Sequence, residues 1–505
     1  MLTNSKAWRT LLQHQQYLAQ SKLIDLFNAD SQRFANFSLR FDDMLCDYSK
    51  QHVTAETMNL LLDLADEANL TQAIADLFAG ALVNKTEQRA ALHSELRNPH
   101  TTRVEIKQTL EQMQDCVAAI KHSDYTDAII LGIGGSDLGP RLVCEALAPY
   151  KTTDLTLHFV SNVDSDTLLP LLQRLNPART LCLINSKTFT TIETLTNAKI
   201  IRVWLGIHSS HNMWAITANP GAAEAFGINA SHVFTFWDWV GGRYSIWSAV
   251  GLPVALTIGM ENFKRLLHGA HMVDQHFATA PLAQNMPVLL GLLGIWNINF
   301  RQHATLCIQP YADGLQLLPA YLQQLEMESN GKSVANSGET VNYQTAPVIW
   351  GGVGCNGQHA YMQMLHQGTQ VVPVDFLVAR RAHAQNQELQ QVLVASCLGQ
   401  SQALMSGRTT KESYKACAGN KPSTTIMFDI ITPEIIGKII ALYEHKVYVQ
   451  GVIWQIQSFD QWGVQLGKDL IKDILQVMSG DNAQNVDSST AGLLDFFLGC
   501  PLTTA

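Results

Sequence analysis

A run of hydroxyl side chains marks the point where an apolar segment, residues 180–185 (TLCLIN), gives way to a helical pattern. The run is Ser186-Lys187-Thr188-Phe189-Thr190-Thr191, with four hydroxyl groups and one lysine. Hydroxyls and backbone amides at the start of a helix bind phosphate, because the free N–H groups and the helix dipole attract an anion. Capping a helix needs only one Ser or Thr. The run therefore favours a phosphomonoester site over a plain cap.

Two glycine-containing turns follow other predicted strands. Residues 132–140 (GIGGSDLGP) come after an apolar run, and glycines there let the backbone approach a ligand. Their spacing matches neither the dinucleotide fingerprint nor the P-loop, so a tight strand-to-helix turn is the alternative. Arg243 follows Gly241 and Gly242 after the strand pattern FTFWDW. On the residues alone, this arginine either faces a ligand or lies in solvent.

Three further motifs hold groups that could move protons. Glu328 lies in the polar turn MESNGK, where it is either a general base or a solvated carboxylate at a helix end. Gln324 precedes it by four residues, on the same face if the helix persists. His366 lies seven residues after another histidine, a spacing that is not a zinc motif. Gln461 and Lys468 are also seven apart. These spacings do not define the reaction.

Composition narrows the class of protein. The 505 residues are 47% hydrophobic and 15% charged, which excludes a disordered chain. The net charge of -9 argues against a general nucleic-acid binder. The nine cysteines are scattered without a C-x-x-C pair, as expected for reduced thiols. The N-terminus lacks the apolar core of a signal peptide, and the apolar stretches suit core helices better than membrane spans. We therefore expect a cytoplasmic protein with no membrane or nucleic-acid partner.

The order of apolar runs predicts an α/β fold. Residues 1–95 show a helical pattern without an evident strand, and short apolar strands then alternate with helix-length segments. Such alternation is typical of parallel sheets built from β-α units. It pauses near residues 262–300 and then resumes, so two α/β domains in series are expected. Ligands of such sheets bind beyond the carboxyl ends of the strands, where the motifs above fall.

Seven motifs occur in an order and spacing that resemble the phosphoglucose isomerase (glucose-6-phosphate isomerase) family. They are GIGGSDLGP, SKTFTT-x-ET, GGRYS, QQ-x-x-MESNGK, NGQHA-x-x-Q-x-x-HQGT, GNKPS and SFDQWGV-x-LGK. With NKTEQRAALH, the similarity extends from Asn84 to Lys468, most of the chain. One such motif has little weight, whereas seven in order are specific.

The resemblance implies the fold and the domain organisation. The family has two sugar-isomerase (SIS) domains, each a parallel sheet flanked by helices, with helical N- and C-terminal additions. On this chain we expect an N-terminal helical segment packing on the large domain, a small first SIS domain, a helical connection, a large second SIS domain and a C-terminal helical segment. Their expected bounds are 1–95, 96–260, 261–300, 301–460 and 461–505.

The resemblance also implies the activity. The family interconverts glucose 6-phosphate and fructose 6-phosphate in glycolysis and gluconeogenesis, an aldose-ketose isomerisation that opens the sugar ring and passes through a cis-enediol(ate). The family works as a homodimer in which both subunits contribute to each active site. No metal or organic cofactor is expected.

Roles are carried over only onto matching positions. Glu328 matches the base that moves the proton, and Arg243 matches the cation that stabilises the enediolate. His366 and Lys468 match the ring-opening groups, and Glu193 matches the carboxylate that orients the histidine. In the family this histidine comes from the neighbouring subunit. The phosphate loop corresponds to Ser186, Lys187 (through its backbone), Thr188 and Thr191. Further substrate contacts correspond to Gly135, Ser136, Gln324 and Gln461.

One departure and two alternatives remain open. The family usually has Glu where this chain has Gln465, one helical turn before Lys468, so we expect an altered lysine environment rather than lost function. A different substrate, such as mannose 6-phosphate, would use the same phosphate loop. A catalytically silent sugar-phosphate sensor is the alternative from another class. The sensor would lack the base or the ring-opening pair, and all the matched positions are present.

Overall fold

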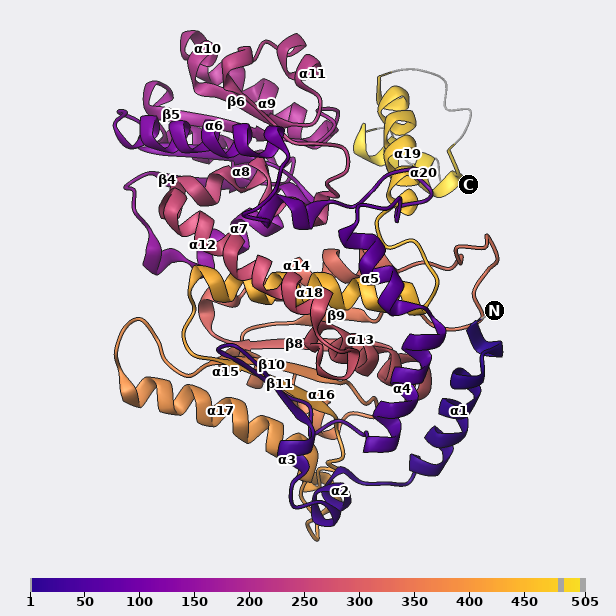
Figure 1. Ribbon diagram of the computed structural model, residues 1–505. Helices are drawn as coiled ribbons and strands as arrows, with labels where there is room; N and C mark the ends of the chain where they lie inside the picture. Colours follow the sequence, from indigo (N-terminus) through magenta and orange to yellow (C-terminus); the bar gives the residue numbers. More distant parts are fainter. Residues whose placement is uncertain (1, 480–485, 500–505) are drawn as a thin grey trace. The chain divides into compact units, whose positions relative to one another are not determined.

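The computed structural model describes residues 2–479 and 486–499, and the chain divides after Ser458 into two compact units. The first unit contains two sheets, one of five strands and one of six. In Figure 1 they form separate layers of this unit, with long helices between them. Among the described residues, no helix is long and apolar enough to cross a membrane.

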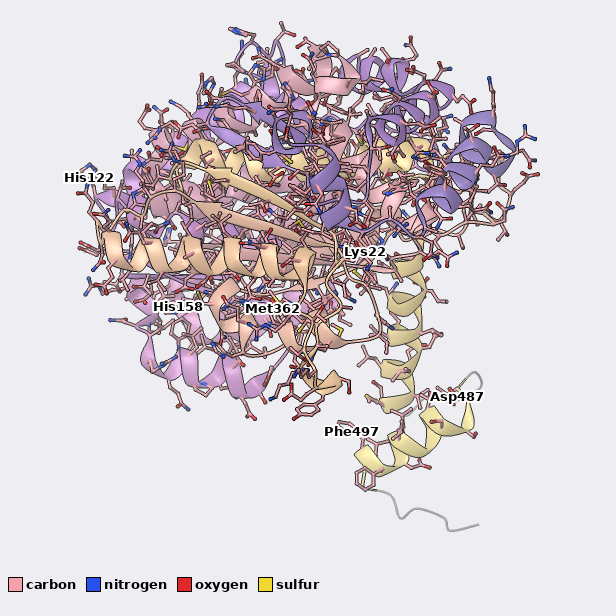
Figure 2. The ribbon with its side chains drawn as sticks, turned by 90° about the horizontal axis from the view of Figure 1, so that it is seen from below. Lys22, His122, His158, Met362, Asp487 and Phe497 are labelled. Carbon is pink, nitrogen blue, oxygen red and sulfur yellow. The ribbon has the colours of Figure 1, made fainter. Side chains whose placement is uncertain are left out.

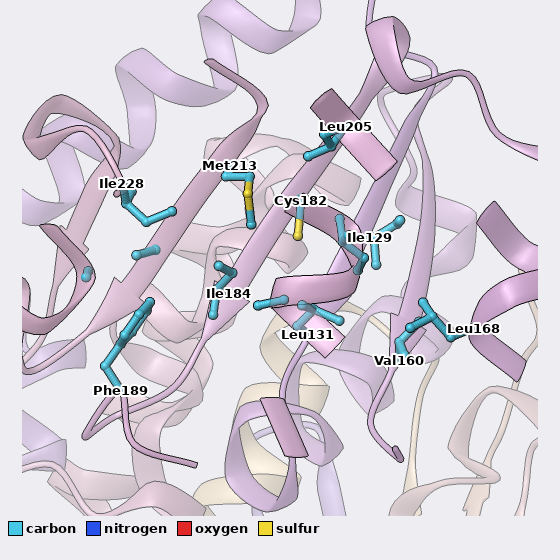
Figure 3. Packing of buried hydrophobic residues seen from close by; sticks show 14 of the residues in the cluster. Ile129, Leu131, Val160, Leu168, Cys182, Ile184, Phe189, Leu205, Met213 and Ile228 are labelled. Carbon is cyan, nitrogen blue, oxygen red and sulfur yellow. The ribbon is translucent and has the colours of Figure 1, made fainter. Parts of the chain in front are cut away.

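The five-stranded sheet is entirely parallel, with strand order β4-β3-β5-β6-β7. Its central strands are almost fully buried, as expected when helices cover both faces of a parallel sheet. Figure 3 shows part of the apolar cluster against it, where Ile129, Cys182 and Ile184 meet Leu205 and Met213. The strands are β3 (Asp127–Leu131), β4 (Thr156–Val160), β5 (Thr180–Asn185), β6 (Met213–Thr217) and β7 (Val233–Thr235).

The six-stranded sheet has the order β1-β2-β11-β10-β8-β9. Its last four strands are parallel, and a second apolar cluster covers them. The first two strands form an antiparallel hairpin that pairs with β11. The strands are β1 (Ser38–Phe41), β2 (Met44–Asp47), β8 (Thr305–Tyr311), β9 (Val348–Gly351), β10 (Val374–Ala379) and β11 (Ser423–Phe428).

The hairpin corrects the expectation that residues 1–95 hold no strand, and it adds two antiparallel strands at one edge of the second parallel sheet. Its strands are only four residues long, too short for a clear alternating pattern. Asp42 occupies the left-handed region (φ 52°) and supplies the tight turn between them. Lys438 donates to Asp42 and, at 2.6 Å, to Asp43 Oδ1, so a buried cation from the far end of the chain holds this turn.

Helices cover both sheets, and their bounds are as follows. Those before β3 are α1 (Lys6–Leu18), α2 (Leu23–Ala29), α3 (Arg33–Asn36), α4 (Ala55–Glu67), α5 (Leu70–Phe78) and α6 (Val104–Lys121). Those among the strands of the five-stranded sheet are α7 (Leu138–Ala146), α8 (Ser165–Arg174), α9 (Ile192–Leu205), α10 (Ser209–Asn212) and α11 (Pro220–Ala225). Those after β7 are α12 (Leu252–Thr279), α13 (Met286–Ile295), α14 (Leu318–Leu322), α15 (Gly354–Gln358), α16 (Met362–Gln367), α17 (Gln387–Ser406) and α18 (Pro433–Ile453).

The helices α12 and α18 lie against each other between the two sheets (Figure 1). Gly437 of α18 makes this close approach possible, because a Cβ there would lie 2.1 Å from the backbone oxygen of Leu266 on α12. Nearly every residue of α18 is buried, including several charged ones. This helix therefore forms the centre of the first unit.

The second unit contains α19 (Trp462–Met478) and α20 (Ser488–Phe497). Asp487 caps α20, since its carboxylate accepts from the backbone N–H groups of Ser489 and Thr490. Figure 2 labels Asp487 at the start of α20 and Phe497 at its end.

Candidate active site

Glu328 ends a widened helical turn beyond the carboxyl end of β8. The helix α14 continues as a π-helical turn, Gln323–Glu328 (η13), before two more helical residues. Single π turns of this kind occur often at functional sites. The Glu328 side chain is 20% exposed, and its Oε2 accepts from Gln324 Nε2 at 2.9 Å. The turn itself is partly buried, and it presents the Glu328 carboxylate to solvent. Gln324 and Glu328 lie on the same helical face, as the sequence predicts.

Arg243 lies buried beside this carboxylate, on the turn Gly242–Trp247 (η8). Its Nη1 is 3.5 Å from Glu328 Oε2. Its Nε donates to Ser329 Oγ at 2.6 Å, and its Nη2 donates to the backbone oxygen of Ser458 at 2.6 Å. Three nitrogens of the guanidinium therefore have defined neighbours, which fixes its plane.

Ser329 was not predicted from the sequence, yet it joins the two groups. It follows Glu328 directly, is fully buried, and its hydroxyl also meets the Tyr244 hydroxyl at 3.0 Å. In the sequence, a serine before Asn-Gly is an ordinary feature of a helix end. Nothing local shows that its partner is an arginine 86 positions earlier.

The glycine turn at Gly134–Ser136 (η3) packs directly against the turn that carries Arg243. A Cβ at Gly135 would lie 2.0 Å from the backbone oxygen of Gly242, so only glycine allows this contact. Asn185 Nδ2, at the end of β5, donates to the backbone oxygen of Ser136 at 3.0 Å. The structure thus brings the motifs of Gly135, Ser136 and Arg243 together at the carboxyl ends of β3, β5 and β7.

The hydroxyl run connects β5 to α9, as the sequence predicts. Ser186 Oγ donates to Thr191 Oγ1 at 3.3 Å, and the hydroxyls of Thr188 and Thr190 meet at 2.7 Å. Thr191 occupies the N-cap position of α9, but its side chain caps no backbone N–H. Phe189 points into the apolar cluster of the five-stranded sheet (Figure 3), and this packing holds the loop against the sheet. The loop therefore holds its hydroxyls on a fixed scaffold at the start of a 14-residue helix.

Lys187 joins this loop to the segment that leads to Arg243. Its Nζ donates to the backbone oxygens of Asp238 at 2.8 Å and Val240 at 2.7 Å. Burial and, to a smaller extent, the positive charge of Arg89 lower the pKa of Lys187 to about 8. The side chain thus links two loops, and the expectation that the lysine meets phosphate through its backbone stays a prediction.

His366 and Glu193 lie on helices that flank different sheets of the chain. His366 is on α16 beside the six-stranded sheet, and its Nε2 meets Gln400 Oε1 of α17 at 2.8 Å. Glu193 is in the first turn of α9, beside the five-stranded sheet. Within the described residues of one chain, the imidazole is therefore held by an amide, and its pairing with Glu193 stays a prediction.

Gln461 and Lys468 belong to the second unit, which begins at Phe459. Gln461 immediately precedes α19, and Lys468 lies exposed on that helix. Gln465, which stands where the family usually has Glu, donates through Nε2 to Asp469 Oδ1 at 3.0 Å. A carboxylate therefore remains close to this part of α19 despite the substitution.

The fold and these groups define a class of protein. It is an α/β protein with two helix-flanked sheets, in which a carboxylate and a buried guanidinium face each other near a hydroxyl-rich loop. Such a pair suits proton transfer next to a carbonyl, because the carboxylate takes the proton and the cation stabilises the resulting oxyanion.

Comparison with known proteins gives the family. The sequence model of the family described as Phosphoglucose isomerase matches residues 47–494, so the chain belongs to the phosphoglucose isomerase family. The chain is 45% identical over 540 aligned positions to the glucose-6-phosphate isomerases of Shewanella sp. (strain ANA-3) and Shewanella oneidensis, covering 98% of this chain and 99% of each relative. The resemblance expected from the seven motifs is thereby confirmed.

A solved structure gives the same result for the fold. The crystal structure of a glucose-6-phosphate isomerase from Chlamydia trachomatis superposes with a TM-score of 0.90 at 30% sequence identity. It covers 99% of both chains. The predicted α/β fold class is therefore confirmed, apart from the antiparallel hairpin.

The lowered pKa of Lys187 predicts a pH dependence of stability. In the unfolded chain this lysine should titrate near 10.5, whereas in the folded chain it titrates near 8. Between these values the unfolded state binds a proton that the folded state has released, so the free energy of unfolding rises with pH. Below pH 8 both states hold the proton, and the cost of the buried charge is fully present.

Urea unfolding of wild type and Lys187→Met at about pH 7.5, 9 and 10.5 tests this prediction, because these pH values span the range between the folded and unfolded pKa of Lys187. We expect wild type to gain stability relative to the variant as pH rises through this window. A difference that stays constant with pH would contradict the buried, charge-penalised state of Lys187.

Proposed function

We propose that this chain catalyses the reversible isomerisation of glucose 6-phosphate to fructose 6-phosphate. The observation that carries the proposal is the Glu328 carboxylate, partly exposed, 3.5 Å from the buried Arg243 guanidinium. Family membership supports it, because the Shewanella relatives are named glucose-6-phosphate isomerases. A cytoplasmic location is part of the proposal, supported by the free thiols of the eight cysteines that the structure describes.

The phosphate end of the sugar has a defined place in this proposal. The hydroxyls of Ser186, Thr188 and Thr191 and the backbone of Lys187 hold the phosphate at the start of α9. The dipole of that helix favours a dianion there. Gly135, Ser136, Gln324 and Gln461 contact the rest of the sugar. Binding energy from the phosphate then orients C1 and C2 toward Glu328.

Proton transfer follows from the carboxylate and the guanidinium. In the open aldose, Glu328 removes the proton from C2, the C–H electrons form a C1–C2 double bond, and charge develops on O1. Arg243 stabilises that charge, because its guanidinium is already fixed by Ser329 and the Ser458 carbonyl. The O2 proton passes to O1, and Glu328 returns its proton to C1. The product is the ketose, with a carbonyl at C2.

Ring opening uses the remaining groups. His366, oriented by Glu193, and Lys468 move the proton between the ring oxygen and the anomeric hydroxyl. Within one chain the His366 imidazole meets Gln400 instead of Glu193, so we assign the histidine of each site to the partner in a homodimer, as the family resemblance implies.

Replacing Glu328 by Gln tests the role of the base. The change keeps the shape of the side chain and its contact with Gln324, but it removes the proton acceptor. We expect kcat to fall by about 10²- to 10⁴-fold with the fold intact. A coupled assay from fructose 6-phosphate measures this, with the exposed Glu339→Gln as a matched control. Equal activity in both variants would place the base elsewhere. An inactive wild type that still binds the phosphosugar would favour a sensor.

Mixing two inactive variants tests the shared active site. Glu328→Gln and His366→Gln subunits are each inactive as homodimers in this proposal. In a mixed dimer, one site receives both substitutions and the other receives neither. Random reassociation should therefore restore about one quarter of wild-type activity. Denaturing, mixing and refolding the two variants provides the measurement. No recovery from properly formed mixed dimers would mean that each site uses only its own chain.

A further inference from the structure

Three consecutive ionisable residues of α18, Glu444-His445-Lys446, are all buried. Each of the three residues is at most 2% exposed. Removing charges from water costs several kcal/mol for each ion, and an apolar replacement of a buried pair often stabilises a protein. Stability alone therefore gives no reason for charges at the centre of this helix. The contacts of Lys446 and Glu444 show which parts of the first unit these two residues position.

Lys446 contacts the turn that carries Glu328. Its Nζ lies 2.6 Å from Glu326 Oε2, and both side chains are almost completely buried. Glu326 belongs to the same π-helical turn as Glu328, two residues before it. One residue further along α18, the backbone oxygen of Val447 accepts from Asn330 Nδ2 at 2.9 Å. The helix thus holds the turn on both sides of Glu328.

Glu444 contacts the turn that carries Arg243. Its Oε1 accepts from Trp247 Nε1 at 2.9 Å, and Trp247 ends the short helix that contains Arg243. Its Oε2 accepts from Arg97 Nη1 at 2.5 Å. Arg97 in turn donates to both carboxylate oxygens of Asp274 on α12, at 2.6 and 2.7 Å. The turn of Arg243 is therefore tied to both central helices.

We propose that Lys446 and Glu444 are positioning residues that set the distance between Glu328 and Arg243. The two turns are far apart in the sequence and follow strands of different sheets. Arg243 and Ser329 join them directly, and α18 adds a contact to each turn. A single buried helix contacts both turns through directional, charged hydrogen bonds. This role rests on the proposed function, in which both groups act on the same two carbon atoms.

The matched pair of lysines on α18 gives the test. Lys446→Met removes the bond to Glu326, whereas Lys438→Met removes an equally buried lysine whose partners are Asp42 and Asp43 of the hairpin turn. We expect Lys446→Met to lower kcat by about 10- to 100-fold, as a misplacement of about 1 Å does. KM should change by less than about twofold, because the phosphate loop belongs to the other sheet. Lys438→Met should lose stability but keep its kcat.

A double variant separates position from stability and covers the case in which Lys446→Met does not fold. Lys446→Met with Glu326→Leu removes both charges of this ion pair, although Asp375 still loses the nearby cation, so thermal stability should return in part. The directional bond is still absent, so kcat should stay low. Recovery of kcat together with stability would overturn the positioning role, as would equal kcat in the two single lysine variants.

Trp247→Phe is the corresponding test on the other turn. It keeps an aromatic ring but removes the indole N–H that Glu444 accepts. We expect a lowered kcat with nearly unchanged KM, and an unchanged kcat would overturn the role of Glu444. An inactive wild type would instead overturn the proposed function itself. An active wild type makes each of these comparisons a test of positioning alone.

Discussion

The gap between Arg243 Nη1 and Glu328 Oε2 is the constraint on which the account depends. At 3.5 Å, with the guanidinium buried and the carboxylate partly exposed, the two groups are close enough to act on neighbouring atoms of one substrate. Opposite charges at this distance attract, yet the two groups stay farther apart than the usual length of a charge-assisted hydrogen bond. Bonds to Ser329 and the Ser458 carbonyl hold its other nitrogens in place.

Much of the first unit serves to keep that gap constant. The glycine turn packs against the turn of Arg243, and Lys187 links the hydroxyl loop to the segment that precedes Arg243. The helix α18 contacts both the turn of Arg243 and the turn of Glu328. Each support comes from a distant part of the chain. Burying these charges costs free energy that apolar side chains would not cost. The arrangement therefore favours a fixed geometry over the greatest stability.

The sequence predicted features that are local and missed those that depend on distant partners. The hydroxyl run and the glycine turn were predictable, because a strand, a loop and a helix follow one another over about 20 residues. The motif order predicted the family. The β1–β2 hairpin was missed, since four-residue strands leave no periodic pattern. Ser329 and Lys446 gave no signal, because their partners lie 86 and 120 positions away. The roles of His366, Glu193 and Lys468 stay predictions.

A crystal structure of the protein with bound fructose 6-phosphate tests the central claim most directly. The account predicts the phosphate on the hydroxyls of Ser186, Thr188 and Thr191. It predicts C1 and C2 within about 3 to 3.5 Å of the Glu328 carboxylate, with a sugar oxygen on Arg243 Nη1. A sugar whose C1 and C2 face away from Glu328, or whose phosphate binds at another loop, would contradict it.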